Sequence, residues 1–341
     1  MDDIVRLREE EGLTFAEIAK RLGYNSWERA RDAYNKAAKR ASELTAEYHR
    51  NEAAEAILPR TGGLLDDPVR PLVLPPKGEY IVTEKNNEVL TALLWGDTHM
   101  GFEDEKALEI VRQIALEMQP NCLIHMGDLL DCYKLSRFDK DPDRLDGLQD
   151  EINKARLHLA AMRTTCRSAR FILLEGNHED RMRRTLWNTD EASSTLMRLT
   201  NVRQALTWPT LLGLADLDID FYPYQGQSKI NLLPKFIVKH GTVVRKFSGY
   251  TARGEWEKYG KSGGSGHVHR LGVFYHRDNS GSNVWVETGC TCRLDPEYTD
   301  NPDWQQGCVF LTFEPETGAV NVCPIYIHKG MAVFNGNVYR A

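Results

Sequence analysis

Short apolar runs that each end in a polar cluster with a glycine recur through this chain, and they limit the folds that it can adopt. The first three runs alternate with two stretches of helical periodicity, in the order 89–95, 107–118, 121–126, 151–165 and 170–174. Such alternation predicts a sheet with parallel strands and with helices packed on it. The last third of the chain changes to strand-like runs with few helices between them. We therefore expect an α/β fold with a second, more antiparallel sheet.

The polar residues directly behind the apolar runs form the candidate site. Carboxylate, imidazole and amide oxygen groups are ligands for divalent metals, and alternate positions such as Asp97 and His99 point to the same side of an extended backbone. Five of the ten histidines of the chain lie in these clusters, so their order and placement favour one metal site over chance. The clusters are Gly96-Asp97-Thr98-His99, Gly127-Asp128-Leu129-Leu130-Asp131, Gly176-Asn177-His178-Glu179, His240-Gly241 and Gly266-His267-Val268-His269.

These motifs, read as D-x-H, GD, GNH, HG and GHxH, resemble the signature of the calcineurin-like metallophosphoesterases over about half of the chain. The resemblance implies a four-layer α/β/β/α sandwich that binds two divalent ions bridged by Asp128. It assigns Asp97, His99, Asp128 and His269 to the first ion, and Asp128, Asn177, His240 and His267 to the second. We expect Mn²⁺, with Fe²⁺, Zn²⁺ and Ni²⁺ as alternatives, because such nitrogen and oxygen ligands accept all four ions.

The resemblance also implies catalytic roles for His178 and Asp131. His178 follows the ligand Asn177 and is expected to protonate the leaving oxygen as general acid, after attack by a metal-activated hydroxide. Asp131 is expected to orient this imidazole, although capping of the following segment is an alternative role. Glu179 and Asp180 are expected to be structural or to support the ligands, with solvated surface positions as the alternative.

One departure from the family pattern bears on the substrate. The protein serine/threonine phosphatase branch continues GD-x-x-D with Arg-Gly, whereas Cys132 and Tyr133 follow Asp131 here. This difference argues against protein dephosphorylation. The HG and GHVHR motifs are more similar to those of the DNA-repair exonuclease and phage-type phosphoesterase branch.

Residues 1–50 predict a small all-α module. Thr14 with Glu17 forms a capping-box pattern, Gly23 can end the second helix, and Ser26 can cap the third. Two helices joined by a short glycine-containing turn are typical of a helix-turn-helix DNA reader, and a helical cap or dimerisation arm is the alternative. A proline- and glycine-rich linker is expected over 51–80, and the catalytic domain over 81–341.

Charge gives mixed evidence about nucleic acid as a partner. A net charge of −6 and a pI near 6.0 do not favour it, since DNA-binding proteins usually gather a basic surface. Local cations and aromatic residues near the motifs could bind a phosphate backbone and stack on bases, or could be solvated helix faces and core positions. They are Arg181, Arg183, Arg184, Arg245, Lys246, Arg253, Lys258, Lys261 and Arg270, with Tyr250, Trp256 and Tyr259.

Cysteine usage and hydropathy indicate the compartment. The seven cysteines are an odd number without a repeated C-x-x-C spacing, so we expect reduced thiols, with Cys290 and Cys292 packed on one face of a core strand. No apolar run is long enough to cross a membrane. These features predict a cytoplasmic protein of a bacterial or phage-infected cell.

Three functions fit these observations. The leading hypothesis is a two-metal phosphodiesterase that hydrolyses DNA as a nuclease or nicking endonuclease, recruited by its N-terminal helices. The alternative is a phosphoesterase for nucleotides or cyclic nucleotides, in which the helices only assemble subunits, for example as a homodimer. A DNA-binding regulator with a vestigial metal site is the third, and the intact set of seven ligand positions argues against it.

Overall fold

The structure, a computed structural model, divides into two compact units, Met1–Pro68 and Val69–Ala341. Each is described by itself. The residues described are 7–8, 13–36, 80–82, 89–137, 139–141, 143–188, 191–224, 229–232, 236–279, 281–296, 302–314 and 317–341. The predicted linker over 51–80 therefore lies almost entirely outside the described residues, as does the end of the predicted helical module.

The described residues 13–36 of the first unit form two helices joined by a short turn. Helix α2 (Phe15–Leu22) begins at Thr14, whose side chain forms the predicted capping box with Glu17, and it ends at Gly23 with a φ of 76°. A second helix covers 27–36, and the hydroxyl of Ser26 accepts from the backbone N–H of Arg29 at 3.4 Å. The two helices pack through a small apolar cluster that includes Leu7, Ile18, Ala19 and Ala30.

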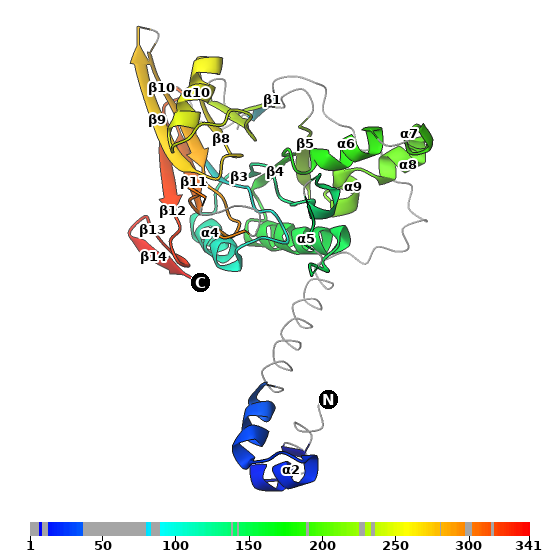
Figure 1. The fold of residues 1–341 in the computed structure, drawn as a ribbon. Coiled ribbons are helices and arrows are strands. Elements are labelled where there is room, and N and C mark those ends of the chain that lie inside the picture. The colour runs from blue at the N-terminus through cyan, green and yellow to red at the C-terminus, as the bar shows by residue number, and fades with distance from the viewer. Residues whose placement is uncertain are drawn as a thin grey trace. The chain divides into compact units, whose positions relative to one another are not determined.

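The second unit is built on two six-stranded sheets (Figure 1). The first sheet has the order β12-β11-β2-β3-β4-β5, and its strands β2 to β5 are parallel. The bounds are β2 Leu90–Trp95, β3 Cys122–His125, β4 Arg170–Leu174, β5 Ile219–Tyr222, β11 Gly307–Phe313 and β12 Val320–Tyr326.

The second sheet has the order β1-β6-β7-β8-β10-β9 and mixes parallel with antiparallel pairs. Its bounds are β1 Tyr80–Val82, β6 Ile230–Leu232, β7 Phe236–Lys239, β8 Ser262–Ser265, β9 Leu271–Asp278 and β10 Gly281–Thr288. A separate hairpin joins β13 (Met331–Phe334) to β14 (Asn337–Arg340).

The expectation that the strands of the last third form one separate sheet is wrong in part. Strands β9 and β10 join the second sheet, but β11 pairs antiparallel with β2 and brings β12 with it into the first sheet. The register of this pairing places Val309 opposite Leu94. Apolar runs of similar composition occur in both sheets, so composition alone did not distinguish them.

Side-chain alternation along the strands creates the four layers. In β2, Leu93 and Trp95 belong to one buried cluster, whereas Ala92 and Leu94 belong to another. The second cluster also contains Val238 of the opposite sheet, so it is the core between the two sheets. The predicted α/β/β/α sandwich is confirmed, because the outer faces of both sheets are covered by helices (Figure 1).

Helices α4 (Glu105–Met118), α5 (Leu148–Thr165) and α9 (Trp208–Leu212) cover the first sheet through the outer cluster. Helix α10 (Tyr250–Tyr259) covers the second sheet, where its Ala252 packs with Ile237 and Trp285. The shorter helices are η1 Tyr133–Leu135, α6 Asp180–Asn188, α7 Glu191–Leu196 and α8 Thr200–Ala205. No helix of the described residues is long and apolar enough to span a membrane.

Candidate metal centre

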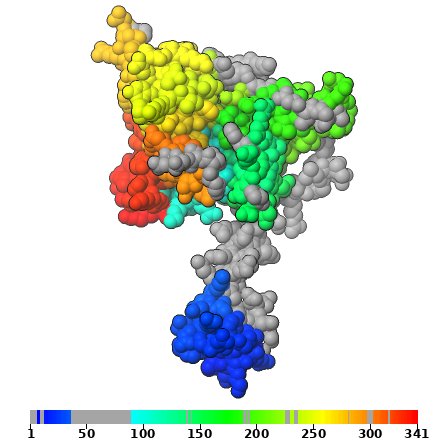
Figure 2. All heavy atoms as spheres, in the orientation of Figure 1, coloured from blue at the N-terminus to red at the C-terminus, as the bar shows by residue number. Residues whose placement is uncertain are grey.

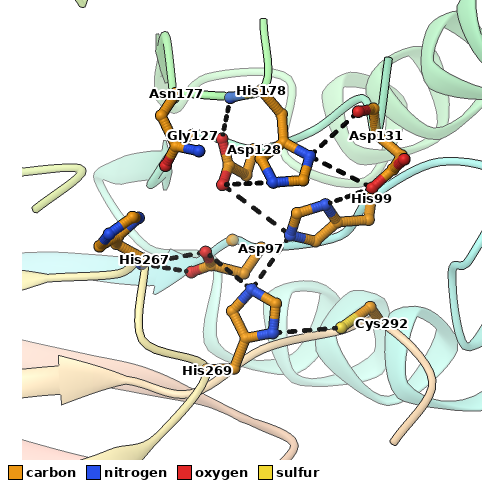
Figure 3. Close-up of polar contacts among 12 residues, drawn as sticks. Asp97, His99, Gly127, Asp128, Asp131, Asn177, His178, His267, His269 and Cys292 are labelled. Carbon is orange, nitrogen blue, oxygen red and sulfur yellow. Dashed lines mark hydrogen bonds and ion pairs between the residues drawn. The ribbon is translucent and has the colours of Figure 1, made fainter. Parts of the chain in front are cut away.

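The carboxyl ends of five strands bring the predicted ligands together (Figure 3). Strands β2, β3 and β4 are followed by the clusters of Asp97, Asp128 and Asn177, and strands β7 and β8 of the opposite sheet are followed by those of His240 and His267. Sites in open α/β sheets gather at this edge. The seven positions, scattered over more than 170 residues of sequence, thus come together at the ends of these strands.

The backbone at five of these positions is left-handed rather than extended, which corrects the alternation expected from the sequence. Five of the seven predicted ligands have a positive φ, namely Asp97 (48°), His99 (50°), Asp128 (51°), His267 (76°) and His269 (57°). Non-glycine residues rarely adopt this left-handed conformation, and such strain concentrates at functional sites. Left-handed turns, rather than strand alternation, therefore aim these side chains into the centre.

One group of possible ligands contains Asp97, His99 and His269, whose donor atoms all lie within 4.8 Å of one another. Nε2 of His269 lies 3.5 Å from Oδ1 of Asp97 and 3.1 Å from Nε2 of His99. Burial lowers the pKa of both histidines, which keeps the rings neutral. Neutral imidazole is the form that binds metals.

A second group contains Asp128, His240 and His267, again with donor atoms within 4.8 Å of one another. Oδ2 of Asp128 lies 3.3 Å from Nε2 of His240, and it also lies 3.9 Å from Nε2 of His99 in the first group. The amide oxygen of Asn177 lies 3.0 Å from Nε2 of His240. Asp128 thus lies between the groups, at the position that the sequence expectation gives to the bridging ligand.

The chemistry of these donors fits divalent cations. Nδ1 of His267 is buried and has no hydrogen-bond partner among the described residues, so a ligand atom is available there. Burial raises the pKa of Asp97 to about 8, with the nearby Asp128 carboxylate adding to the effect. A cation would compensate these buried carboxylates in place of a proton. Residues of both groups could therefore hold one ion each.

His178 lies at the rim of the centre between Asp131 and Arg181. Its Nδ1 lies 3.2 Å from Oδ1 of Asp131 and donates to the main-chain oxygen of the same residue at 3.0 Å. Its Nε2 lies 3.0 Å from Nη2 of Arg181. Burial acts to lower the pKa of His178, but the carboxylates of Asp128 and Asp131 outweigh it and raise the pKa.

Asp131 also contacts the imidazole of His99, a contact that was not expected from the sequence. Nδ1 of His99 lies 3.0 Å from the Oδ1 of Asp131, inside the buried part of the site. A carboxylate partner fixes the tautomer of a ligand histidine and leaves the other nitrogen for the metal. Asp131 therefore orients both a predicted ligand and the predicted acid.

Glu179 holds the backbone of two motif turns. Its carboxylate accepts from the N–H groups of Asp128 (3.1 Å), Leu130 (2.7 Å) and Gly176 (2.8 Å). Gly176 itself must lack a side chain, because a Cβ there would overlap Oδ1 and the backbone nitrogen of Asp128. The supporting role expected for Glu179 thus consists of anchoring the turns that carry Asp128 and Asn177.

Two neighbours of His269 were not identified as site residues from the sequence. The ring of Trp304 packs edge-on against His269 with centroids 4.2 Å apart, and Sγ of Cys292 lies 3.8 Å from Nδ1 of His269. Cys290 and Cys292 are buried as expected, but they lie in isolated bridges after β10 rather than within a strand. Trp304 belongs to no motif. It is brought to the site by the next residue, Gln305, whose backbone N–H donates to the carbonyl of His269.

The loop between β7 and α10 lies beside the centre and exposes aromatic and cationic side chains. Arg270 donates to the carbonyl of Arg245 at 3.0 Å, which joins this loop to the segment after His269. Phe247 and Tyr250 are about half exposed, with ring centroids 5.6 Å apart. In Figure 2 the yellow surface of the α10 region adjoins the orange surface of the segments near residue 290.

Several other aromatic and cationic candidates nearby make contacts within the protein. Trp256 and Tyr259 are partly buried and pack against the small cluster under α10, which favours the core alternative for these two rings. Arg253 forms an ion pair with Glu257 at 2.8 Å. Arg270 forms one with Asp303 at 3.3 Å. Of the candidates in this stretch, Arg245, Lys246, Tyr250, Lys258 and Lys261 are exposed, and Phe247, which was not a candidate from the sequence, is exposed beside them.

The fold and the candidate metal centre are those of a metal-dependent phosphoesterase. A family model described as calcineurin-like phosphoesterase matches residues 90–290, more than half of the chain. The chain belongs to this family, whose members are typically metal-dependent hydrolases with two ions. The resemblance proposed from the motifs is thereby confirmed.

Individual relatives are more distant. The chain is 24% identical over 242 residues to the Gene 54 protein of Mycobacterium phage L5, a match that covers 67% of this chain and 91% of the phage protein. Among solved structures, Vacuolar Protein Sorting 29 from Cryptosporidium parvum matches with a TM-score of 0.39 at 13% identity, covering 74% of this chain and 97% of that one. Yfce, a phosphoesterase from E. coli, matches with a TM-score of 0.29 at 11% identity, covering 70% and 100%.

Proposed function

We propose that this protein is a metal-dependent phosphodiesterase that hydrolyses DNA, with ions held by Asp97, His99, Asp128, Asn177, His240, His267 and His269. Mn²⁺ is the ion that we propose first. When bound, such ions polarise the phosphate and lower the pKa of a bound water. The observation that carries the proposal is the exposed segment 244–250, which is the end of the loop before α10 together with Tyr250 of α10. It lies against the segment after His269 and offers cations and rings there.

The chemistry of this loop matches nucleic acid. Arg245 and Lys246 are exposed cations that can bind backbone phosphates, and Phe247 and Tyr250 present ring faces on which bases stack. Ser248 donates to the carbonyl of Leu271, which holds the loop next to the strand that follows the centre. A mononucleotide needs only one such ring, whereas a polymer can use the whole loop.

The helix pair of the first unit supports DNA as the substrate. Helix α2 and the helix over 27–36 are separated by four residues, a spacing typical of helix-turn-helix readers. The second helix exposes Trp27, Arg29 and Arg31, while Ala30 faces the small core. We propose that this exposed face binds duplex DNA and recruits the enzyme to it.

Within the centre we propose that His178 donates a proton to the leaving oxygen. Its pKa is raised by the carboxylates of Asp128 and Asp131 despite burial, which favours the protonated ring. The 3.0 Å contact between Nε2 and Arg181 favours the neutral ring instead, because Nε2 accepts in that contact. The contact must therefore break, and Nε2 must take up a proton from solvent, before His178 can donate. Asp131 stays in contact with Nδ1 of His178 during this change.

The test is cleavage of supercoiled plasmid by the full chain in Mn²⁺, run beside turnover of mononucleotide and cyclic nucleotide esters. We expect nicked or linear DNA, and a loss of about 100-fold or more in His178→Ala, because general acids contribute that much. Hydrolysis of nucleotides without plasmid cleavage would support the alternative substrate class. DNA binding without hydrolysis in any divalent metal would overturn the enzyme proposal.

The role of the helices has its own test. The double variant Arg29→Gln, Arg31→Gln should weaken plasmid binding and reduce its dependence on salt, because two phosphate contacts are lost. Turnover of a small phosphodiester by the same variant should be unchanged. Equal plasmid binding by the variant and the wild-type protein would instead favour an assembly role, which the oligomeric state would then report.

A further inference from the structure

Three arginines follow the Asn177-His178 motif, and the structure separates them. Arg183 and Arg184 both bind the buried carboxylate of Asp180, with the Nε of Arg184 at 2.7 Å. Arg181 lies on the same helix, α6, but its guanidinium contacts the rim of the metal centre. The sequence offered all three as phosphate-binding candidates, and the geometry favours one.

The guanidinium of Arg181 is fixed at this rim by two contacts. Nη1 donates to the main-chain oxygen of Asp131 at 2.7 Å, and Nη2 lies 3.0 Å from Nε2 of His178. An arginine has five N–H groups, so these contacts leave others for a ligand. The side chain is 18% exposed, and it therefore keeps access to solvent at the mouth of the site.

We propose that Arg181 binds a non-bridging oxygen of the substrate's phosphate, as a specificity-determining residue of the centre. The inference rests on the proposed function, since it assumes that a phosphate ester enters beside His178. The predicted ligands are carboxylates, an amide and imidazoles, none of which carries a permanent positive charge. Arg181 does carry one, and its guanidinium is in direct contact with His178. Planar guanidinium groups recognise phosphate through paired hydrogen bonds.

Binding of the phosphate also changes the hydrogen bonding of His178. While Nη2 of Arg181 donates to Nε2, that nitrogen cannot donate to a substrate oxygen. A phosphate oxygen is a stronger acceptor for a guanidinium than an imidazole nitrogen is, because the acceptor carries charge. The Nη2 donor of Arg181 therefore turns from Nε2 of His178 to the phosphate. Nε2 is then free to take up a proton from solvent, which it can donate to the ester oxygen. Nη1 can keep its bond to Asp131, so the guanidinium needs only a small rotation.

The experiment compares Arg181→Gln, Arg181→Lys and the control Arg184→Gln in the full-length, Mn²⁺-loaded protein. Arg184→Gln removes the same charge from the same helix, and Asp180 keeps its hydrogen bonds from Arg183. Steady-state kinetics use bis(p-nitrophenyl) phosphate as the substrate. Calorimetry measures the affinity for inorganic phosphate and, separately, the affinity of each variant for Mn²⁺.

We expect Arg181→Gln to weaken phosphate binding and to raise KM by about tenfold or more, the usual effect of losing a hydrogen bond to a charged group. Arg181→Lys should restore part of the loss as a point charge, while Arg184→Gln and the Mn²⁺ affinity of all variants stay unchanged. Unchanged phosphate affinity in Arg181→Gln, or an equal loss in Arg184→Gln, would overturn the inference. A lower kcat with normal phosphate affinity would show that Arg181 only positions His178.

The two proposals fail separately. If the wild-type protein hydrolyses no ester in any divalent metal, the proposed function is wrong. Phosphate affinity of the Mn²⁺-loaded protein still reports on Arg181 in that case. Conversely, robust hydrolysis by the wild-type protein with no effect of Arg181→Gln on KM or on phosphate affinity leaves the function standing and removes the inference.

Discussion

Nδ1 of His99 lies 3.0 Å from Oδ1 of Asp131, so a carboxylate expected to serve the catalytic acid also holds a predicted metal ligand. The same oxygen lies 3.2 Å from Nδ1 of His178. The two imidazole rings are edge to face, with centroids 4.3 Å apart. The proposed metal binding and the proposed proton transfer would therefore be coupled through one side chain, and a change at Asp131 should affect both.

Asp131→Asn tests this coupling. Both rings contact the same oxygen of Asp131, and in the amide this oxygen is neutral and a weaker acceptor, so each ring is held less firmly than by the carboxylate. We expect Mn²⁺ affinity to fall by about 10- to 100-fold, the usual effect of losing the partner of a ligand histidine, together with a lower kcat. His178→Gln is the matched control, because it should lower kcat and leave Mn²⁺ affinity intact. Normal Mn²⁺ affinity in Asp131→Asn would contradict the coupling.

Gly176→Ala should disrupt the centre from the backbone side. The added methyl group would overlap the carboxylate and the backbone nitrogen of Asp128, and both are fixed by the turns around them. We expect a loss of about 1–3 kcal/mol in the free energy of unfolding, as for other overpacked sites, and weak binding of Mn²⁺. Urea denaturation and calorimetry measure the two effects.

Gly147→Ala is the control for that substitution. Gly147 precedes α5 with a φ of −102°, and its nearest neighbour to an added Cβ is a carboxylate oxygen of Asp150 at 3.6 Å. This variant should retain the stability and the Mn²⁺ affinity of the wild-type protein. Equal behaviour of the two alanine variants would show that Asp128 can move away from residue 176 without cost.

The sequence predicted the candidate ligands because each follows a strand end, and parallel neighbouring strands bring their carboxyl ends together. Asp97, Asp128 and Asn177 follow three such neighbours, β2, β3 and β4. Apolar runs and their order are local properties, which a sequence displays directly. The four-layer sandwich could be expected from the family resemblance, whereas the sheet that β11 joins depends on long-range pairing with β2.

The roles of single side chains depended on contacts that no local pattern displays. Arg181 and Arg184 lie on one short helix with the same charge, and only the three-dimensional path of each side chain separates them. Trp304 lies 35 residues beyond His269 in sequence, and it reaches that ring through a loop with no motif of its own. Sequence reasoning therefore identified candidate ligands better than the residues that support them.

Trp304 is expected to hold the ring of His269 in place. Its indole packs edge-on against the imidazole, and the N–H of the next residue, Gln305, donates to the carbonyl of His269 at 2.8 Å. We expect Trp304→Ala to weaken Mn²⁺ binding by about tenfold, since residues that orient a ligand have effects of this size. Trp304→Phe should keep most of the affinity because a ring remains.

Trp187→Ala provides the comparison for Trp304, because Trp187 lies on α6 with 53% of its surface exposed. The Mn²⁺ affinity of Trp187→Ala should equal that of the wild-type protein. Calorimetric titration with Mn²⁺ decides between the outcomes. If Trp304→Ala binds Mn²⁺ normally but has a higher KM for DNA, the ring contacts substrate rather than orienting the ligand.

His158 should make the stability of the second unit depend on pH. Its Nε2 accepts from the indole Nε1 of Trp95 at 3.2 Å, and burial lowers the pKa of His158 to about 4. The unfolded chain has a histidine pKa near 6.5 and takes up a proton first as the pH falls. The contribution of His158 is therefore fully present above about pH 6.5 and is lost between there and about pH 4, by roughly 2–3 kcal/mol.

Urea denaturation between pH 7 and pH 4 measures this contribution as a difference between two proteins. His158→Gln keeps an acceptor for Trp95 but has no titrating group in this range. Because the other buried histidines remain, both proteins should lose stability in acid, and the wild-type protein should lose more. If the free energy of unfolding of the two proteins falls with pH along parallel curves, His158 has the same pKa in the folded and the unfolded state. The hydrogen bond from Trp95 would then not hold the ring neutral.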